Sequence, residues 1–256
     1  MFVQDRTAIV PIIDALLAAV PASDSRILDV RIGTAWTAVV AEVDGTRRCG
    51  LAATLSRLGH DGPSVRDAGS LHTHSSQDLC QLARFDSPAE VPVGMAAINA
   101  LLPPPPGPWQ DVNASDLLAE RGADKTVALV GHFPFVDWLR ERVKTLWVLE
   151  LAPQAGDLPA SAAAEVIPQA DIVALTSMTL LNHTFDGLMA LRRPDAQVML
   201  LGPSTPLTPL LFNRGVDLLS GSVVEEIDAV LRGVSQGAGF RQLHRLGVRL
   251  VTMTRL

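Results

Sequence analysis

Groups suited to proton transfer and to substrate orientation follow apolar runs in the second half of this 256-residue chain. His132 comes after the run Thr126–Val130, and the pair Asn182-His183 comes shortly after the run Asp171–Leu175. Histidine moves protons near neutral pH, and an asparagine amide holds a carboxylate or a carbonyl group. We therefore predict His132 as the acid/base residue and Asn182 as a substrate-orienting group, with His183 as the runner-up for either role. The alternative is that both histidines only cap helices and pack.

Glu150 ends another apolar run, about twenty residues after the loop that starts at Gly131, where Rossmann-type sheets place the acid that binds ribose hydroxyls. A pyrophosphate-binding loop needs three spaced glycines, and here only Gly131 is present before His132 and Phe133. S-adenosylmethionine has a ribose but no phosphate, so it needs no such loop. We predict that Glu150 binds a nucleoside, and a solvated carboxylate at a strand end is the equal alternative.

Small and hydroxyl residues follow the ends of further apolar runs. Thr176, Ser177 and Thr179 follow one run, and Gly202, Ser204 and Thr205 follow another. Free backbone N–H groups at the helix starts that come next would attract an anionic ligand, although ordinary helix capping needs the same residue types. The predicted ligand-binding set is Gly131, Phe133, Glu150, Thr176, Ser177, Thr179, Gly202, Ser204 and Thr205.

A soft-metal site is the other chemistry that the residue types suggest. His72 and His74, together with Cys49 and Cys80, supply the ligand types that zinc prefers. Their spacing matches no closed zinc motif, so we predict a polar loop and ordinary thiols, with no metal ligands. A His-Glu-x-x-His zinc motif is also missing from the sequence.

The elements that must position these groups form two different patterns, and the first half of the chain has the pattern of a small α+β domain. Residues 5–20 have apolar residues at helical spacing, with a bend or a late start at Pro11. Three strand-like runs follow, and Asp44-Gly45 between two of them is a strong hairpin signal. These runs, predicted as an antiparallel meander, are Ile27–Ile32, Trp36–Val43 and Arg47–Ala52.

Helices and a proline-rich spacer end this first half. Ser75 or Ser76 is predicted to cap a short helix, and a longer helix is expected at Pro92–Leu102 with Pro92 in its first turn. The run from Pro103 to Pro108 cannot lie inside a helix or a sheet, so it serves as a stiff spacer. We predict domains at residues 1–106 and 107–256.

After a helix near 115–121, buried strands alternate with helices. This alternation predicts a parallel sheet with right-handed crossovers, that is, a Rossmann-like α/β domain. The predicted strands are Thr126–Val130, Thr145–Leu151, Asp171–Leu175, Ala196–Leu201 and Val216–Val224. Helices are expected near 134–143, 181–191, 206–214 and 225–234. A last pair of strands, Gln242–Leu246 and Val248–Met253, is expected at the sheet edge.

Composition excludes several classes of partner. The formal net charge is −6 without a basic stripe, which disfavours nucleic acid. No apolar run approaches the ~18 residues of a membrane span, and the N-terminus lacks the pattern of a signal peptide. Two cysteines do not make a disulfide framework, so we expect the protein to be located in the reducing cytoplasm. The expected partner is a small molecule, and neither nucleic acid nor a membrane is expected. A homodimer is possible.

Several longer runs resemble a little-characterised two-domain family that carries a heavy-metal chelation label. The similar runs begin at Met95, Val130, Glu150, Gly156, Thr179, Leu201 and Gly215. The resemblance covers most of the chain. It implies an N-terminal domain similar to the enolase N-terminal fold, a Rossmann-like C-terminal domain, and a ligand site in the cleft between them.

Two functions from different classes follow from these observations. The first is an enzyme of the S-adenosylmethionine-dependent lyase or transferase class, which cyclises or cleaves its substrate and releases methylthioadenosine. The second is a protein that binds or chelates a heavy metal or a metal chelate without catalysis. Glu150 favours the first and the family label favours the second. We favour the enzyme, with S-adenosylmethionine as the expected ligand and with no metal cofactor supported by ligand spacing.

Overall fold

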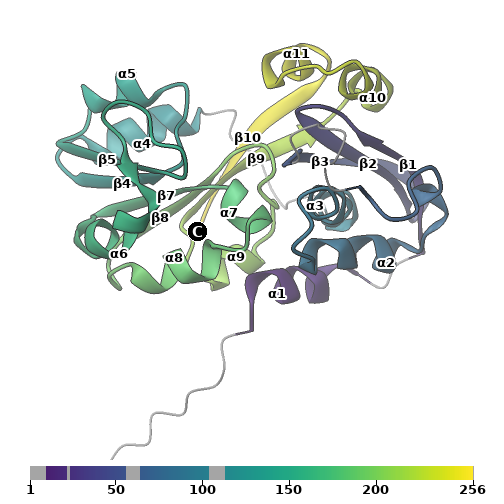
Figure 1. Cartoon of the computed structure of the whole chain (residues 1–256), viewed down its shortest axis with the longest axis horizontal. Coiled ribbons are helices and arrows are strands. Elements are labelled where there is room, and N and C mark those ends of the chain that lie inside the picture. Colours follow the sequence, from purple (N-terminus) through teal and green to yellow (C-terminus); the bar gives the residue numbers. More distant parts are fainter. Residues whose placement is uncertain (1–9, 22–23, 56–63, 104–112, 256) are drawn as a thin grey trace, which may run out of the picture.

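The computed structural model describes residues 10–21, 24–55, 64–103 and 113–255 and contains two β-sheets (Figure 1). Three antiparallel strands from the first half form one sheet in the order β1-β2-β3. Seven strands from the second half form the other sheet. The predicted fold class, a small α+β part followed by a Rossmann-like parallel sheet, is confirmed.

Local signals fix the elements of the first half. Helix α1 begins directly after Pro11, whose fixed φ suits a helix start. Asp44 and Gly45 both have positive φ, 48° and 76°, as a two-residue hairpin turn requires. Ser75 caps its helix by accepting a hydrogen bond from the Asp78 N–H. The elements are α1 (Ile12–Ala19), β1 (Ser25–Ile32), β2 (Trp36–Val43), β3 (Thr46–Ala53), α2 (Ser76–Gln81) and α3 (Val91–Leu101).

The sheet of the second half has the strand order β10-β9-β8-β7-β4-β5-β6. All neighbours are parallel except the pair of β9 and β10. Its strands are β4 (Thr126–Val130), β5 (Thr145–Glu150), β6 (Leu158–Pro159), β7 (Ile172–Thr176), β8 (Gln197–Leu201), β9 (Leu218–Val224) and β10 (Val248–Thr254). The chain moves outward from β4 to one edge and then restarts at β7 on its other side. This reversal is the switch point at which doubly wound sheets bind ligands.

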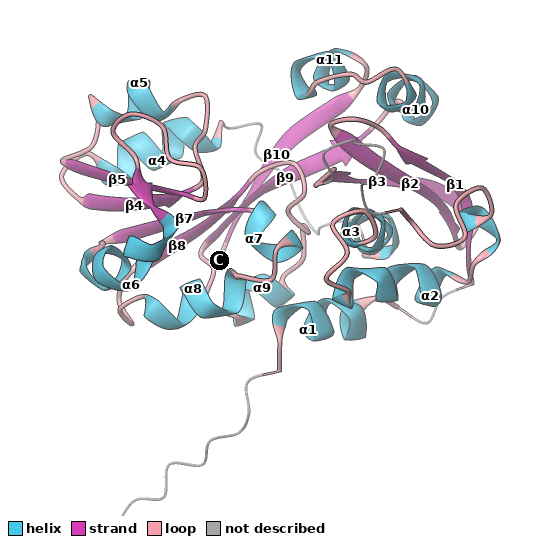
Figure 2. Ribbon diagram, in the orientation of Figure 1, coloured by secondary structure: helices cyan, strands magenta, loops and turns pink. Residues whose placement is uncertain are grey.

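Helices cover both faces of this sheet (Figure 2). Alternate residues of β7 therefore enter different cores: Ile172 and Ala174 pack with α4 and α5, whereas Val173 and Leu175 pack on the opposite side. This double burial explains the continuous apolar runs of the strands. The helices are α4 (Ala114–Gly122), α5 (Val136–Arg140), α6 (Ala163–Val166), α7 (Met178–Leu181), α8 (Phe185–Leu191), α9 (Leu210–Asn213), α10 (Ile227–Ser235) and α11 (Phe240–Arg245).

One helix of the second half covers the sheet of the first half. Helix α10 presents apolar residues at helical spacing, and Val230, Leu231 and Val234 pack against Val40 and Leu51 in one core. The other face of the three-stranded sheet is covered by α3. Each half thus supplies one of the layers that enclose β1, β2 and β3.

The structure differs from the sequence prediction in three places. The predicted strand Gln242–Leu246 is wrong, because these residues form helix α11 and the turn after it. The short elements β6 and α6 were not predicted, and the helix predicted near 181–191 is split into α7 and α8. Except for Pro103, the proline-rich spacer lies outside the described residues, as do residues 5–9 of the first predicted helix. No helix among the described residues is long and apolar enough to cross a membrane.

Candidate functional site

A cavity of about 440 Å³ lies at the carboxyl ends of β4, β5 and β7, where the strand order reverses. We call it the switch-point cavity, and its volume is within the ~300–1,000 Å³ of small-molecule sites. Its wall is mostly apolar and includes Leu55, the one contribution from the first half among the described residues. The polar residues that line it are His132, Glu150, Thr176, Thr179, Asn182 and Thr184.

His132 is held in one orientation by a buried carboxylate. Its Nδ1 lies 2.8 Å from Oδ2 of Asp157, whose side chain has no exposed surface. An ionised carboxylate only accepts hydrogen bonds, so the imidazole proton is on Nδ1 and the lone pair is on Nε2. Within the described part of the chain the ring makes its hydrogen bond through Nδ1 and none through Nε2, and the side chain is 24% exposed. This arrangement suits a general base.

Asp157 stays ionised in spite of its burial. Burial alone would raise the pKa of Asp157, but the Gln154 N–H, His132 and Arg140 together hold that pKa below its ordinary value. The Gln154 N–H donates to Oδ2 at 3.0 Å, and Arg140 approaches Oδ1 to 3.5 Å. Oδ1 has no hydrogen-bond partner in the described residues. The charge on Asp157 is thus available to stabilise a protonated His132.

Each carboxylate oxygen of Glu150 accepts one backbone hydrogen bond and can accept another. Its Oε2 accepts the backbone N–H of His132 at 2.8 Å, and its Oε1 accepts the N–H of Leu151 at 2.7 Å. Each carboxylate oxygen has a second lone pair, so a vicinal diol could donate to both. Gly131 allows the neighbouring loop to lie close, because a Cβ there would come within 3.0 Å of Thr176, and its φ is +100°.

Asn182 lines the cavity, and its amide is oriented by Thr184. Its Oδ1 accepts from the N–H of Thr184 at 3.2 Å and from the Thr184 hydroxyl at 2.7 Å. The backbone N–H is always a donor, so this contact assigns the oxygen and leaves Nδ2 as the unoccupied donor within the described residues. The hydroxyls of Thr176 and Thr179 are less available, since Thr176 Oγ1 accepts the Met178 N–H at 3.3 Å and the Thr179 hydroxyl donates to the Thr176 backbone carbonyl at 2.7 Å.

The structure brings seven predicted residues together at the switch-point cavity and leaves the other five outside its wall. The residues that line it are Gly131, His132, Phe133, Glu150, Thr176, Thr179 and Asn182. Ser177 and Gly202 pack against each other at the neighbouring strand ends. The Ser204 hydroxyl accepts the Ala53 N–H at 2.9 Å, and Thr205 lines a different cavity. His183 contacts the Ala83 carbonyl through Nε2 at 2.9 Å and adopts a positive φ of 58°.

The residue types that suggested a soft metal are not assembled into a metal site in the described residues. No group of three or more His, Cys, Asp or Glu side chains that could hold an ion occurs there. Burial raises the pKa of both Cys49 and Cys80 to about 12, so neither thiol is a thiolate at neutral pH. His74 lies 3.4 Å from Asp67 on the surface.

Asp157 is the residue of this site that the sequence interpretation missed. It lies in a loop that had no predicted element, 25 positions after His132. The local signal was weak: Gly156, with a φ of +87°, marks a turn directly before the aspartate. The parallel pairing of β5 with β6 and the Arg140 bond to the Gly156 carbonyl at 2.8 Å hold this loop near His132.

Comparisons with known proteins agree with the arrangement of the two halves. The profile of the DUF364 family, described as "putative heavy-metal chelation", matches residues 113–253, and that of DUF4213, with the same description, matches residues 13–102. An uncharacterized protein of Methanocaldococcus jannaschii is 25% identical over 220 residues, which cover 81% of this chain and 82% of that one.

Solved structures of DUF364 proteins of unknown function share this fold. The protein from Desulfitobacterium hafniense superposes with a TM-score of 0.78 at 24% identity, covering 95% of this chain and 98% of that one. The protein from Pyrococcus horikoshii has the same TM-score and coverages at 19% identity. At these identities the likeness supports the fold alone. Because the first profile matches more than half of the residues, the chain belongs to the DUF364 family, described as "putative heavy-metal chelation".

Proposed function

We propose that the protein is an enzyme that binds a nucleoside-containing small molecule in the switch-point cavity, with S-adenosylmethionine as the first candidate. The observation that carries this proposal is the convergence of an oriented acid/base pair, His132 with Asp157, and of a carboxylate with free acceptor capacity, Glu150, on one apolar cavity. A general base, an orienting amide and a ribose acceptor are the parts that such a site needs.

The residues that line the cavity, and the missing glycines in the loop after β4, indicate which ligand the site would bind. Glu150 would accept both ribose hydroxyls, and the Phe133 ring in the cavity wall offers a flat apolar surface to a purine. The loop after β4 has one glycine where a pyrophosphate grip needs three, which favours a nucleoside without phosphates. The Asn182 Nδ2 would hold a substrate carboxylate.

The reaction class that we favour is an intramolecular displacement at the sulfonium. A nucleophilic group of the amino-acid portion attacks the carbon next to sulfur, the carbon–sulfur bond breaks, and sulfur keeps the electron pair in neutral methylthioadenosine. The proton that the nucleophile loses goes to Nε2 of His132, and the charge on Asp157 stabilises the imidazolium. Elimination that gives the same leaving group would use the same base.

Binding experiments test the nucleoside assignment. A thermal-shift screen with S-adenosylmethionine, methylthioadenosine, NAD and divalent metal ions identifies the ligand, since a ligand at 100 times its dissociation constant stabilises by ~2.7 kcal/mol. Calorimetry then compares Glu150→Gln with the matched surface variant Glu165→Gln. We expect Glu150→Gln to lose ~1.5–3 kcal/mol of nucleoside binding and Glu165→Gln to lose none. Unchanged affinity in Glu150→Gln would exclude the clamp.

A second candidate is the binding of a metal chelate without catalysis, which the family description favours. In that case an organic chelator, rather than protein side chains, would supply the metal ligands, because the described residues hold no cluster of three or more ligating groups. Stabilisation by metal chelates and by no nucleoside in the same screen would support this candidate over the enzyme.

A further inference from the structure

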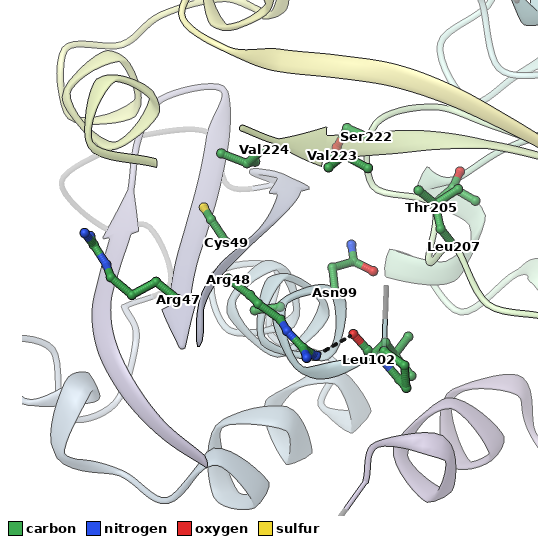
Figure 3. A pocket seen from close by; sticks show the side chains of 12 residues that line it. Arg47, Arg48, Cys49, Asn99, Leu102, Thr205, Leu207, Ser222, Val223 and Val224 are labelled. Carbon is green, nitrogen blue, oxygen red and sulfur yellow. Dashed lines mark hydrogen bonds between the residues drawn. The ribbon is translucent and has the colours of Figure 1, made fainter. Parts of the chain in front are cut away.

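A second cavity, of about 160 Å³, lies where the two halves of the chain meet. The edge strand β3 and the end of α3 form one side, and β9 with the loop after β8 forms the other (Figure 3). We call it the seam cavity. It shares no lining residue with the switch-point cavity, so it is a separate space.

Two buried polar atoms of the seam cavity have no hydrogen-bond partner among the residues that the structure describes. Asn99 extends from α3 toward β9 (Figure 3), and its Nδ2 donates to the carbonyls of Leu51 at 2.9 Å and Ser204 at 3.1 Å. Carbonyls only accept, so the amide orientation is fixed and Oδ1 is left as an acceptor. Oδ1 of Asn99 and Oγ1 of Thr205, a residue only 2% exposed, have no hydrogen-bond partner in the described part of the chain. Folded proteins rarely leave such atoms unsatisfied unless something else binds them.

The charge of the lining is positive. Arg47 and Arg48 are the charged residues that line the cavity, and no carboxylate lines it among the described residues. Arg47 is already paired with Asp228 at 2.8 Å. Half-buried Arg48 makes only a 3.5 Å contact with the Leu102 carbonyl and has no carboxylate partner in the residues that the structure covers. Its guanidinium therefore remains available for an anion, for which its planar fork is well suited.

We propose that the seam cavity binds a small carboxylate that also carries a neutral hydrogen-bond donor, a hydroxyl or an amide N–H. The carboxylate pairs with Arg48, and the donor is accepted by Asn99 Oδ1, with Thr205 Oγ1 as the second polar contact. A cationic donor such as an ammonium group is disfavoured, because none of the described residues that line the cavity is a carboxylate that could balance it. The volume of about 160 Å³ is below the ~300–1,000 Å³ of sites for larger small molecules, which favours a ligand as short as a three- or four-carbon hydroxy acid.

Three ligands with the same three-carbon skeleton separate the features that matter. Lactate has both the charge and the donor, propionate lacks the hydroxyl, and lactamide lacks the charge. In thermal-shift titrations of the full chain, matched in ionic strength with sodium chloride, we expect a saturable stabilisation by lactate. Propionate should bind at least tenfold more weakly, and lactamide should give no shift. Equal shifts for lactate, propionate and sodium chloride would overturn the proposal.

Pairs of test and control variants show whether lactate binds in the seam cavity. Arg48→Gln should abolish the lactate shift, whereas Arg26→Gln, which removes an equal charge from a side chain that is 71% exposed, should retain it. Thr205→Val removes a hydroxyl that has no hydrogen-bond partner among the described residues, so the ligand-free melting temperature should stay equal or rise while lactate binding weakens.

Thr37→Val is the control for the hydroxyl deletion. It removes a hydroxyl that is hydrogen-bonded to Thr54 at 3.0 Å, so it should lower the ligand-free melting temperature and leave the lactate shift intact. A lactate shift that survives Arg48→Gln, or a Thr205→Val protein that melts earlier and binds lactate normally, would contradict the assignment and indicate ordered water at these atoms.

Discussion

His132 illustrates how one residue gains a chemical role from a contact that its own sequence neighbours do not show. The imidazole follows β4, which the apolar run predicted, whereas its orientation depends on Asp157 from a distant loop. A histidine with one nitrogen bound to a buried carboxylate has a defined tautomer and a defined free nitrogen. Its role as base is a proposal that two variants test.

His132→Ala should lower the rate of the proposed reaction by ~10²–10⁴ with little effect on folding, as the loss of a general base does. His183→Ala is the matched control, since His183 lies outside the switch-point cavity and contacts the Ala83 carbonyl. Its rate should remain near that of the unmodified protein. The measurement is single-turnover release of methylthioadenosine, alongside thermal melting of each variant. Equal activity of the two variants would assign His132 a packing role.

Asp157→Asn should change how stability depends on pH. The pKa of Asp157 in the folded protein is below its ordinary value, so its contribution is present above pH ~4 and is lost as pH falls from there through the folded pKa. The asparagine variant lacks this titration. We expect it to be less stable at pH 7 and to lose less of its remaining stability between pH ~4 and pH ~2 than the unmodified chain. Parallel curves of unfolding free energy against pH would show that Asp157 is not stabilised as an anion.

Strands and helices with a clear apolar pattern and flanking turn residues could be predicted from the sequence. The bounds of β2 and β4 agree with the prediction, because continuous apolar runs between turn residues mark buried strands. Segment Gln242–Leu246 was misassigned, since a short run with few apolar residues does not distinguish a strand from a helix turn. The two-residue strand β6 is too short to leave a periodic pattern.

The candidate site was predictable to the extent that strand ends determine it. His132, Glu150 and Asn182 could be assigned to one edge because parallel strands align their ends. The positions of Ser204 and Thr205 depend on how the loop after β8 meets the first half of the chain. That packing follows from tertiary contacts, such as the 2.9 Å bond from the Ala53 N–H to Ser204, which no local pattern encodes.

Glycine positions provide a test of how closely α3 packs on its sheet. A Cβ at Gly50 would collide with the backbone of Ala96 and Ala100 in α3, so Gly50→Ala should cost ~1–3 kcal/mol through overpacking. Exposed Gly187 in α8 has open space around it, and Gly187→Ala should stabilise by ~0.5–1 kcal/mol. Urea denaturation measures both changes. A neutral Gly50→Ala would mean that α3 shifts outward at little cost.

The two halves of the chain share apolar cores, which bears on whether each half can fold separately. The boundary near residues 106 and 107 remains a prediction, because it lies outside the described residues. Helix α10 belongs to the second half by sequence yet encloses the sheet of the first half, and two apolar cores each include residues from both halves. Removing either half would expose apolar surface of the other.

We therefore expect unfolding in one cooperative transition. Scanning calorimetry should give equal calorimetric and van't Hoff enthalpies, which is the test for two-state behaviour. Circular dichroism and tryptophan fluorescence should report the same midpoint. Two resolved transitions would instead indicate that the predicted domains 1–106 and 107–256 are independent units that dock after folding.

The short strand β6 has a consequence for the solubility of the chain at high concentration. It is the last strand at one edge of the larger sheet, and its second and final residue is exposed Pro159. Proline has no N–H to donate, so it interrupts the row of backbone groups that a strand from another molecule would need for pairing. Pro159 therefore removes one backbone donor from this edge and disfavours intermolecular sheet extension, the usual first step of β-aggregation, along β6.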